Sequence, residues 1–156
     1  QMEIRYQLKV KRLDDQLFRI EFYDQKTKKR SSPKDVGFGI SQIVHLMVQT
    51  FRIPGYGRRL RVIEEPEAHL HPITQKKISG LLQPDSPAET LLLETHSEAL
   101  ISGYQEQIRD GNLSASDVNV VLIESTENGA KSTNYKLNEV GEFIGGWPEH
   151  LFPILD

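Results

Sequence analysis

The stretch Leu60-Arg-Val-Ile-Glu-Glu-Pro-Glu-Ala-His-Leu-His-Pro72 decides the fold of this 156-residue chain. It opens as a short apolar strand that ends on two glutamates, and Pro72 suits the first residue of a helix that runs to about Gln83. The pattern then repeats, because the apolar strand 90–93 ends at Glu94-Thr95-His96 and Ser97 begins a helix to about Asp110. A third apolar strand follows at 118–123. Apolar strands separated by helices are typical of a parallel α/β sheet.

The flanking segments add hairpins and one further helix. Alternating apolar residues predict two strands at 2–10 and 17–23, and helical spacing predicts a helix from Ile40 to about Phe51. The Asn128-Gly129 turn predicts a hairpin partner at 130–137, and Trp147-Pro148 is the expected anchor of the irregular tail. We expect one domain, divided into an N-terminal hairpin and basic connection (1–32), a core (33–126) and a hairpin with tail (127–156).

Composition excludes several classes of protein. The chain has 19 Lys and Arg and 22 Asp and Glu, hence a net charge of 19 − 22 = −3. This balance excludes a strongly basic nucleic-acid arm and a long acidic tail. The chain has no cysteine, which excludes disulfides, thiolate zinc sites and cysteine nucleophiles. No apolar run approaches the ~18 residues of a membrane span, so we expect a cytoplasmic protein without a membrane partner.

Polar side chains are concentrated where two predicted strands end. Glu64-Glu65 follow the first strand and Glu94-Thr95-His96 follow the second. The carboxyl ends of parallel strands meet at one edge of a sheet, where ligands bind in open α/β folds. A carboxylate there is placed to hold Mg²⁺, a neighbouring carboxylate can orient or deprotonate water, and a histidine can hydrogen-bond a phosphate oxygen. The sequence therefore predicts a site for a bound anion.

Three ordered motifs carry a family resemblance over about residues 33 to 148. The 60–72 stretch resembles the Walker B and D-loop region of ABC-type, AAA-family ATPases in the overcoming-lysogenization-defect and RecF-like branch. The segment Leu91-Leu-Leu-Glu-Thr-His-Ser-Glu98 resembles their switch-histidine region, and Pro33-Lys-Asp-Val-Gly-Phe-Gly-Ile-Ser-Gln42 occupies the place of the signature loop. The tail Gly141-Glu-Phe-Ile-Gly-Gly-Trp-Pro148 is similar to the closing segment of one subgroup. The resemblance implies the C-terminal portion of a P-loop NTPase head.

The resemblance also implies a role for individual residues. Glu64 would be the Walker B acid that holds Mg²⁺, Glu65 the catalytic carboxylate that polarises the attacking water, and His96 the switch histidine that faces the γ-phosphate. The signature loop would cap the nucleotide of a second subunit with backbone N–H groups and the helix dipole, and its residues would be Gly37, Phe38, Gly39 and Ser41. His71, with Ala68 and Leu70, would lie in the D-loop and touch the partner subunit.

The chain departs from the family pattern at two places. The serine that usually precedes the signature glycines is absent, because Val36 stands before Gly37. No Gly-x-x-x-x-Gly-Lys-Ser/Thr occurs, although this Walker A loop cradles the phosphates in P-loop ATPases. We therefore interpret the chain as part of an ATP- and Mg²⁺-dependent ATPase whose Walker A lies upstream. Its heads would sandwich ATP as a dimer, and relatives often act in DNA maintenance or phage defence beside a nuclease.

Other interpretations stay open from the sequence. The chain could be a non-catalytic module for dimerisation or partner docking, or a metal-dependent hydrolase built on Glu64, Glu65, His69 and His71. The basic run Lys26–Arg30, with Lys34 and the arginines at 58, 59 and 61, could contact DNA, although such runs are more often solvated. The first residue is Gln1 rather than Met, so the chain could be a piece of a longer protein, or Met2 could be a start behind a tag remnant.

Overall fold

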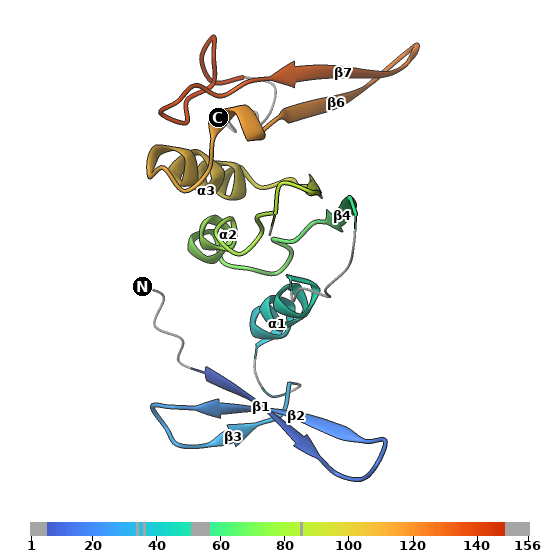
Figure 1. Ribbon diagram of the computed structural model, residues 1–156, viewed down its shortest axis with the longest axis vertical. Helices are drawn as coiled ribbons and strands as arrows, with labels where there is room; N and C mark the ends of the chain where they lie inside the picture. The colour runs from blue at the N-terminus through green and yellow to red at the C-terminus, as the bar shows by residue number, and fades with distance from the viewer. Residues whose placement is uncertain (1–5, 34, 36, 51–56, 85, 149–156) are drawn as a thin grey trace. The chain divides into compact units, whose positions relative to one another are not determined.

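The structure is a computed structural model, which describes residues 6–33, 35, 37–50, 57–84 and 86–148 (Figure 1). The chain forms two compact units. Unit 1 comprises Gln1–Pro54 together with Ala68–Leu70, and unit 2 comprises Gly55–Glu67 together with His71–Asp156. The expected single domain stays a prediction, because compactness does not decide whether the two units fold independently.

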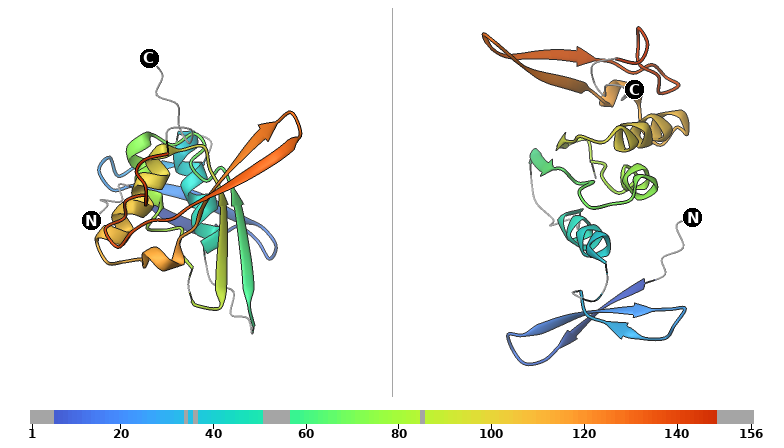
Figure 2. Two further views of the ribbon diagram at one scale, coloured as in Figure 1. Left: turned by 90° about the horizontal axis from the view of Figure 1, so that it is seen from above. Right: turned by 180° about the vertical axis from the view of Figure 1, so that it is seen from behind.

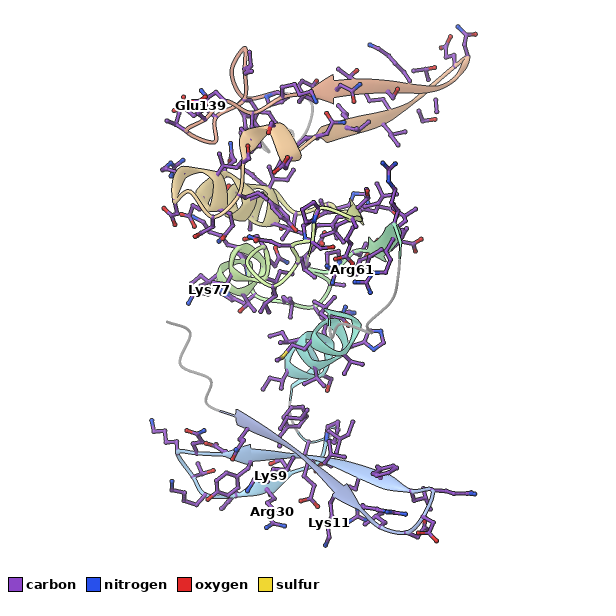
Figure 3. The ribbon with its side chains drawn as sticks, viewed as in Figure 1. Lys9, Lys11, Arg30, Arg61, Lys77 and Glu139 are labelled. Carbon is purple, nitrogen blue, oxygen red and sulfur yellow. The ribbon has the colours of Figure 1, made fainter. Side chains whose placement is uncertain are left out.

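Unit 1 contains a small antiparallel sheet and one helix. The strands β1 (Tyr6–Arg12), β2 (Phe18–Asp24) and β3 (Arg30–Ser31) pair in this order, and the helix α1 spans Phe38–Thr50. The predicted hairpin of two strands is confirmed within the described residues, whereas β3 was not predicted. Val10 pairs with Ile20, so apolar side chains share one face of the hairpin. Lys9 lies on the other face, with its ammonium 4.8 Å from the centre of the Tyr23 ring (Figure 3).

Unit 2 contains the strand–helix repeat that the sequence predicted. Its elements in chain order are β4 (Arg59–Glu64), α2 (Pro72–Ile78), β5 (Glu89–Glu94), α3 (Glu98–Arg109), the short 3-10 helix η1 (Ala115–Asp117), β6 (Val120–Thr126) and β7 (Gly129–Tyr135). The strands β4 and β5 pair in parallel, and β6 and β7 form the predicted antiparallel hairpin, with Glu127 and Asn128 as its turn and Gly129 as the first residue of β7. Figure 2 shows β4 and β5 lying side by side.

The parallel sheet is smaller than the pattern of three apolar strands predicts. Among the described strands, β5 pairs with β4 alone and β6 pairs with β7 alone. The third strand therefore does not join the parallel pair, and the α/β fold consists of three small sheets. Gly129, with a φ of 117°, allows a tight turn between β6 and β7. Because the loop is short, little conformational entropy is lost when β6 pairs with its sequence neighbour.

The helix α2 is shorter than expected, ending at Ile78 rather than near residue 83. Ser79 follows as the C-cap, and its hydroxyl donates to the Lys76 carbonyl instead of supporting another turn. Gly80 then disfavours continuation of the helix. By contrast, α3 runs over nearly the whole predicted range and is followed by Gly111 with a φ of 73°, as expected of a helix stop.

The core of unit 2 lies around the two helices. Ile78, Leu82 and Leu100 are fully buried, and α2 packs against α3 (Figure 1). A second apolar cluster joins α3 to the segment after β7 and contains Ile101, Ile108, Leu137 and Phe143. The Trp147 ring packs edge-on against the buried Phe143 with 5.3 Å between ring centres, as expected of the predicted anchor of the tail, whose residues 149–156 lie outside the described part of the chain.

Candidate functional site

The parallel pairing of β4 and β5 brings the two predicted strand ends together. Glu64 is the register partner of Glu94, so their side chains share one face at the same edge of the sheet, and both are exposed. The Glu65 N–H donates to the Glu94 carbonyl at 2.9 Å and so extends the pairing one residue beyond the strand. The carboxyl ends of β4 and β5 therefore lie together, as the sequence predicts, with Glu64, Glu65 and Glu94 at or directly after them and His96 two residues beyond Glu94.

Glu65 has an unusual backbone conformation. Its φ of 43° lies in the left-handed region, which a residue other than glycine adopts at an energetic penalty. A residue before proline ordinarily takes an extended conformation, so Pro66 makes the positive φ still less favourable. Strain of this kind costs about 1–3 kcal/mol and is concentrated at functional sites. The left-handed conformation turns the chain where β4 ends, and the Glu65 side chain is exposed.

A closed circuit of hydrogen bonds joins the segment after β4 to the segment after β5. The buried Glu67 carboxylate accepts from the Thr95 hydroxyl at 2.7 Å and from the His96 N–H at 2.8 Å, through the same oxygen, Oε1. The Thr95 hydroxyl accepts from the Ser97 N–H at 3.0 Å. The Ser97 hydroxyl donates to the side-chain oxygen of Gln75 at 2.7 Å, and the Gln75 side-chain amide donates to the Glu67 carbonyl at 3.3 Å, which closes the circuit.

The segment after β5 leads into a capped helix. Ser97 is the N-cap of α3, because its hydroxyl accepts from the Leu100 N–H at 3.0 Å. His96 precedes this cap, with its main chain tied to Glu67 and its side chain exposed. The backbone of His96 is therefore held firmly while the imidazole stays accessible to a ligand.

The two histidines of the 60–72 stretch have different surroundings. His71 is the N-cap of α2, and its Nδ1 accepts from the Ile73 N–H at 3.3 Å. His69 is exposed and has a φ of 62°. In the described part of the chain, no three His, Asp or Glu side chains are grouped so that they could hold a metal ion. This arrangement gives no support to a self-contained metal hydrolase that uses His69 and His71.

The signature-like segment lies in unit 1, at the start of α1. The Gly37 carbonyl accepts from the Ile40 N–H at 2.9 Å in the first turn, and the helix begins at Phe38. A Cβ on Gly39 would lie 3.2 Å from the His69 carbonyl oxygen, so this glycine allows the helix to approach the predicted D-loop segment. The Ser41 hydroxyl donates to the Pro33 carbonyl at 3.0 Å, which engages its proton within the segment.

Arg61 has a structural role at the far end of the strand pair. Its guanidinium lies 3.3 Å from the Glu89 carboxylate and donates to the Gln83 carbonyl at 2.6 Å (Figure 3). Arg61 is therefore not available as the DNA-contacting residue that the sequence suggested. Nearby, burial raises the pKa of Tyr104 above its usual range, and Arg61 offsets part of this rise. The Tyr104 hydroxyl accordingly stays protonated and donates to the Leu82 carbonyl.

Four residues of the hydrogen-bond circuit, Glu67, Thr95, Ser97 and Gln75, were not among the predicted site residues. Glu67 lies inside the decisive stretch, but its side chain could equally have been a solvated surface group. The sequence predicts Thr95 only as part of a polar strand end and Ser97 only as the start of a helix, and no pattern points to Gln75. A buried acceptor 28 residues from its donor is a tertiary feature, which the local spacing of residues does not encode.

A family described as "AAA domain, putative AbiEii toxin, Type IV TA system" matches residues 3–102. The chain belongs to this AAA family. A solved SMC ATPase structure, described in terms of ATP-driven dimerization and DNA-stimulated activation, matches this AAA chain with a TM-score of 0.61 at 11% identity. The alignment covers 84% of this chain and 74% of that one. A search of curated proteins gives no match.

These comparisons confirm the predicted resemblance and the fold class. The AAA chain has the α/β fold of the P-loop NTPases, in the form found in ABC-type heads, and is an ATPase-type domain. Among the described helices, none has the length and apolar character needed to cross a membrane.

Proposed function

We propose that this AAA chain forms the C-terminal part of an ABC-type ATPase head that binds and hydrolyses ATP. The observation that carries the proposal is the register of β4 and β5, which pairs Glu64 with Glu94 and ties Glu65 to the Glu94 carbonyl. In this proposal Glu65 orients and polarises the attacking water, and His96 hydrogen-bonds the γ-phosphate. Catalysis of phosphoryl transfer depends on such positioning and electrostatics.

The carboxylates at the strand ends fit a magnesium–nucleotide complex. Mg²⁺ usually binds through one or two carboxylates together with substrate phosphates and water, so a full cage of protein ligands is not required. Glu64, exposed beside Glu94, would hold the ion. When bound, Mg²⁺ would neutralise charge on the phosphate oxygens. Two acidic side chains in direct register repel each other, and a cation between them relieves that repulsion.

The Walker A loop would come from a segment outside the printed sequence. One face of the parallel pair supports this part of the proposal, because Leu60, Val62 and Leu92 on it are 65%, 53% and 56% exposed. Parallel strands are ordinarily covered on both faces. Among the described strands β5 pairs with β4 alone, so a further strand could pair with its other edge. A strand that leads into a P-loop would cover both features.

Dimerisation is the second part of the proposal. The start of α1, at Gly37, Phe38, Gly39 and Ser41, would present backbone N–H groups to the nucleotide of a second head, and His71 would lie at the contact between heads. The SMC ATPase with a similar fold is described as dimerising with ATP, which supports this arrangement. DNA is proposed as a partner because the SMC ATPase is described as activated by DNA, and a nuclease partner and a role in phage defence are proposed from the family resemblance given in the sequence analysis.

The decisive experiment uses the complete protein that contains this chain. Glu65→Gln keeps the size of the side chain and removes its charge, so we expect ATP binding to persist and hydrolysis to slow at least ~10²-fold. Unchanged turnover would refute the catalytic assignment. The 156-residue chain by itself, which lacks the Walker A sequence, should bind ATP weakly or not at all in calorimetry, and micromolar affinity would contradict the proposal.

The alternative is a non-catalytic head that is retained for dimerisation or docking. The Ser41 hydroxyl favours this alternative, since its proton is engaged by Pro33 rather than offered to a phosphate. A complete protein that dimerises with ATP but releases no phosphate would support the docking function. Phosphate release that is lost in the Glu65→Gln variant would support the ATPase.

A further inference from the structure

We infer that Glu67 is a positioning residue for ATP hydrolysis, which sets the distance between the predicted water-polarising Glu65 and the predicted γ-phosphate sensor His96. The inference rests on the proposed function and adds a residue and a mechanism to it. Glu67 follows Glu65 by two positions, yet its side chain points into the protein, where the residue is 6% exposed. It therefore acts on the site through the main chain of the switch segment.

The geometry explains why a carboxylate is used here. One oxygen, Oε1, accepts from the Thr95 hydroxyl at 2.7 Å and from the His96 N–H at 2.8 Å. Hydrogen bonds to an ionised acceptor are shorter and roughly twice as strong as neutral ones. The His96 main chain is thus fixed by the strongest acceptor available to a protein, at the residue whose side chain has to meet the phosphate.

The circuit gives the switch segment one defined orientation. Thr95 donates to Glu67 and accepts from the Ser97 N–H, so its hydroxyl proton has a single position. Ser97 then donates to Gln75, whose amide bonds the Glu67 carbonyl. Because each group polarises the next, such chains of hydrogen bonds reinforce one another. A shift of Glu67 would therefore be transmitted to His96 and to the start of α3 together.

The second carboxylate oxygen indicates that stability alone does not explain this residue. Oε2 of Glu67 is buried and accepts no hydrogen bond within the part of the chain that the structure describes. A buried, half-satisfied carboxylate is less favourable for folding than an apolar side chain of the same shape. A positioning role accounts for a carboxylate at this place, since an apolar side chain could not hold Thr95 and His96.

The test compares three variants in the complete protein by steady-state ATP hydrolysis. Glu67→Met keeps the length of the side chain and removes the acceptor, so we expect kcat to fall by about tenfold to a hundredfold with KM for ATP changed less than about twofold. Glu67→Gln retains an acceptor oxygen for both donors and should recover kcat to within about threefold of the unaltered protein. The control, Tyr104→Phe, removes a buried hydrogen bond elsewhere in unit 2 and should leave kcat unchanged.

Other outcomes would overturn the inference. Unaltered kcat in Glu67→Met, or an equal loss of kcat in Tyr104→Phe, would show that Glu67 does not position the site. If Glu67→Met does not fold, Thr95→Val keeps the shape and removes one donor to Glu67, and it should lower kcat by about threefold to tenfold. Normal kcat in Thr95→Val would equally refute the inference.

The two proposals fail in distinguishable ways. If the unaltered protein hydrolyses no ATP, or if Glu65→Gln hydrolyses it normally, the proposed function is wrong and the role of Glu67 falls with it. If hydrolysis depends on Glu65 but not on Glu67, the proposed function stands and the positioning role is wrong.

Discussion

Replacing Gly103 with alanine tests the packing that holds the site. Gly103 lies in α3 where it meets α2, and a Cβ there would be 2.2 Å from the Lys76 carbonyl oxygen and 2.7 Å from the Ser79 hydroxyl oxygen. Ordinary contact begins at 3.4 Å, so the two helices would have to part by about 3.4 − 2.2 = 1.2 Å. Ile78 and Leu100, which are completely buried, would lose contacts.

The expected magnitude follows from two opposing effects. Overpacking costs about 1–3 kcal/mol, and we take the upper end because the opposing atom is main chain and cannot rotate away. Alanine gains about 1 kcal/mol over glycine in a helix interior. The net loss in the free energy of unfolding is therefore about 2 kcal/mol, or about 4–8 °C in Tm for a chain of this size.

Urea and thermal unfolding followed by circular dichroism would measure this loss. Gly80→Ala is the matched control, because Gly80 is exposed, has no positive φ, and a Cβ there would have its nearest neighbours at 3.6 Å. We expect Gly80→Ala to change the free energy of unfolding by less than about 0.5 kcal/mol. An unfolding midpoint of Gly103→Ala equal to that of the unaltered chain, or an equal loss in Gly80→Ala, would refute the argument.

Three further substitutions test the site and its support. Glu65→Gly should relieve about 1–3 kcal/mol of backbone strain in the folded state and lose about 0.5–1 kcal/mol because glycine adds entropy to the unfolded chain. Urea unfolding should therefore show a gain of about 1 kcal/mol in the free energy of unfolding while ATPase activity is lost, and a loss of stability would contradict the assigned strain. Ser97→Ala should lower the free energy of unfolding by about 1–2 kcal/mol, because the α3 cap and the donor to Gln75 are removed together. His71→Ala should lower it by less, because the capping hydrogen bond of His71 is longer and exposed. Leu100→Ala should lose about 2–5 kcal/mol in the same assay, and a loss below 1 kcal/mol would show that its site collapses around the smaller side chain.

The elements that could be predicted from the sequence are those specified by local chemistry. The strands β4 and β5 lie within one residue of their predicted ends, because apolar runs bounded by glutamates and turns leave little choice of register. The helix α3 was located by its cap at Ser97 and its stop at Gly111. The hairpin of β6 and β7 followed from the turn signal Asn128-Gly129, although the turn itself is one residue earlier, at Glu127 and Asn128.

The features that the sequence did not reveal depend on tertiary contacts. Which strand pairs with β5 is decided by the partners available in space, so a third apolar strand did not guarantee a three-stranded parallel sheet. The left-handed conformation of Glu65 opposes the preference imposed by Pro66 and could not be expected from local rules. The burial of Glu67 joins residues far apart in sequence, whereas surface exposure is the usual state of a glutamate.

These two departures from local preference occur two residues apart, at Glu65 and Glu67. At Glu65 the main chain is strained and the carboxylate is exposed, and at Glu67 a buried carboxylate binds the segment after β5 through one oxygen while its other oxygen accepts no hydrogen bond among the described residues. Sequences usually satisfy local rules and violate them where function requires it. Because each departure lowers stability and each acts on the same strand ends, selection for folding alone would favour other residues at both positions. In the proposed function, a shared demand for geometry between Glu65 and His96 would account for both of them.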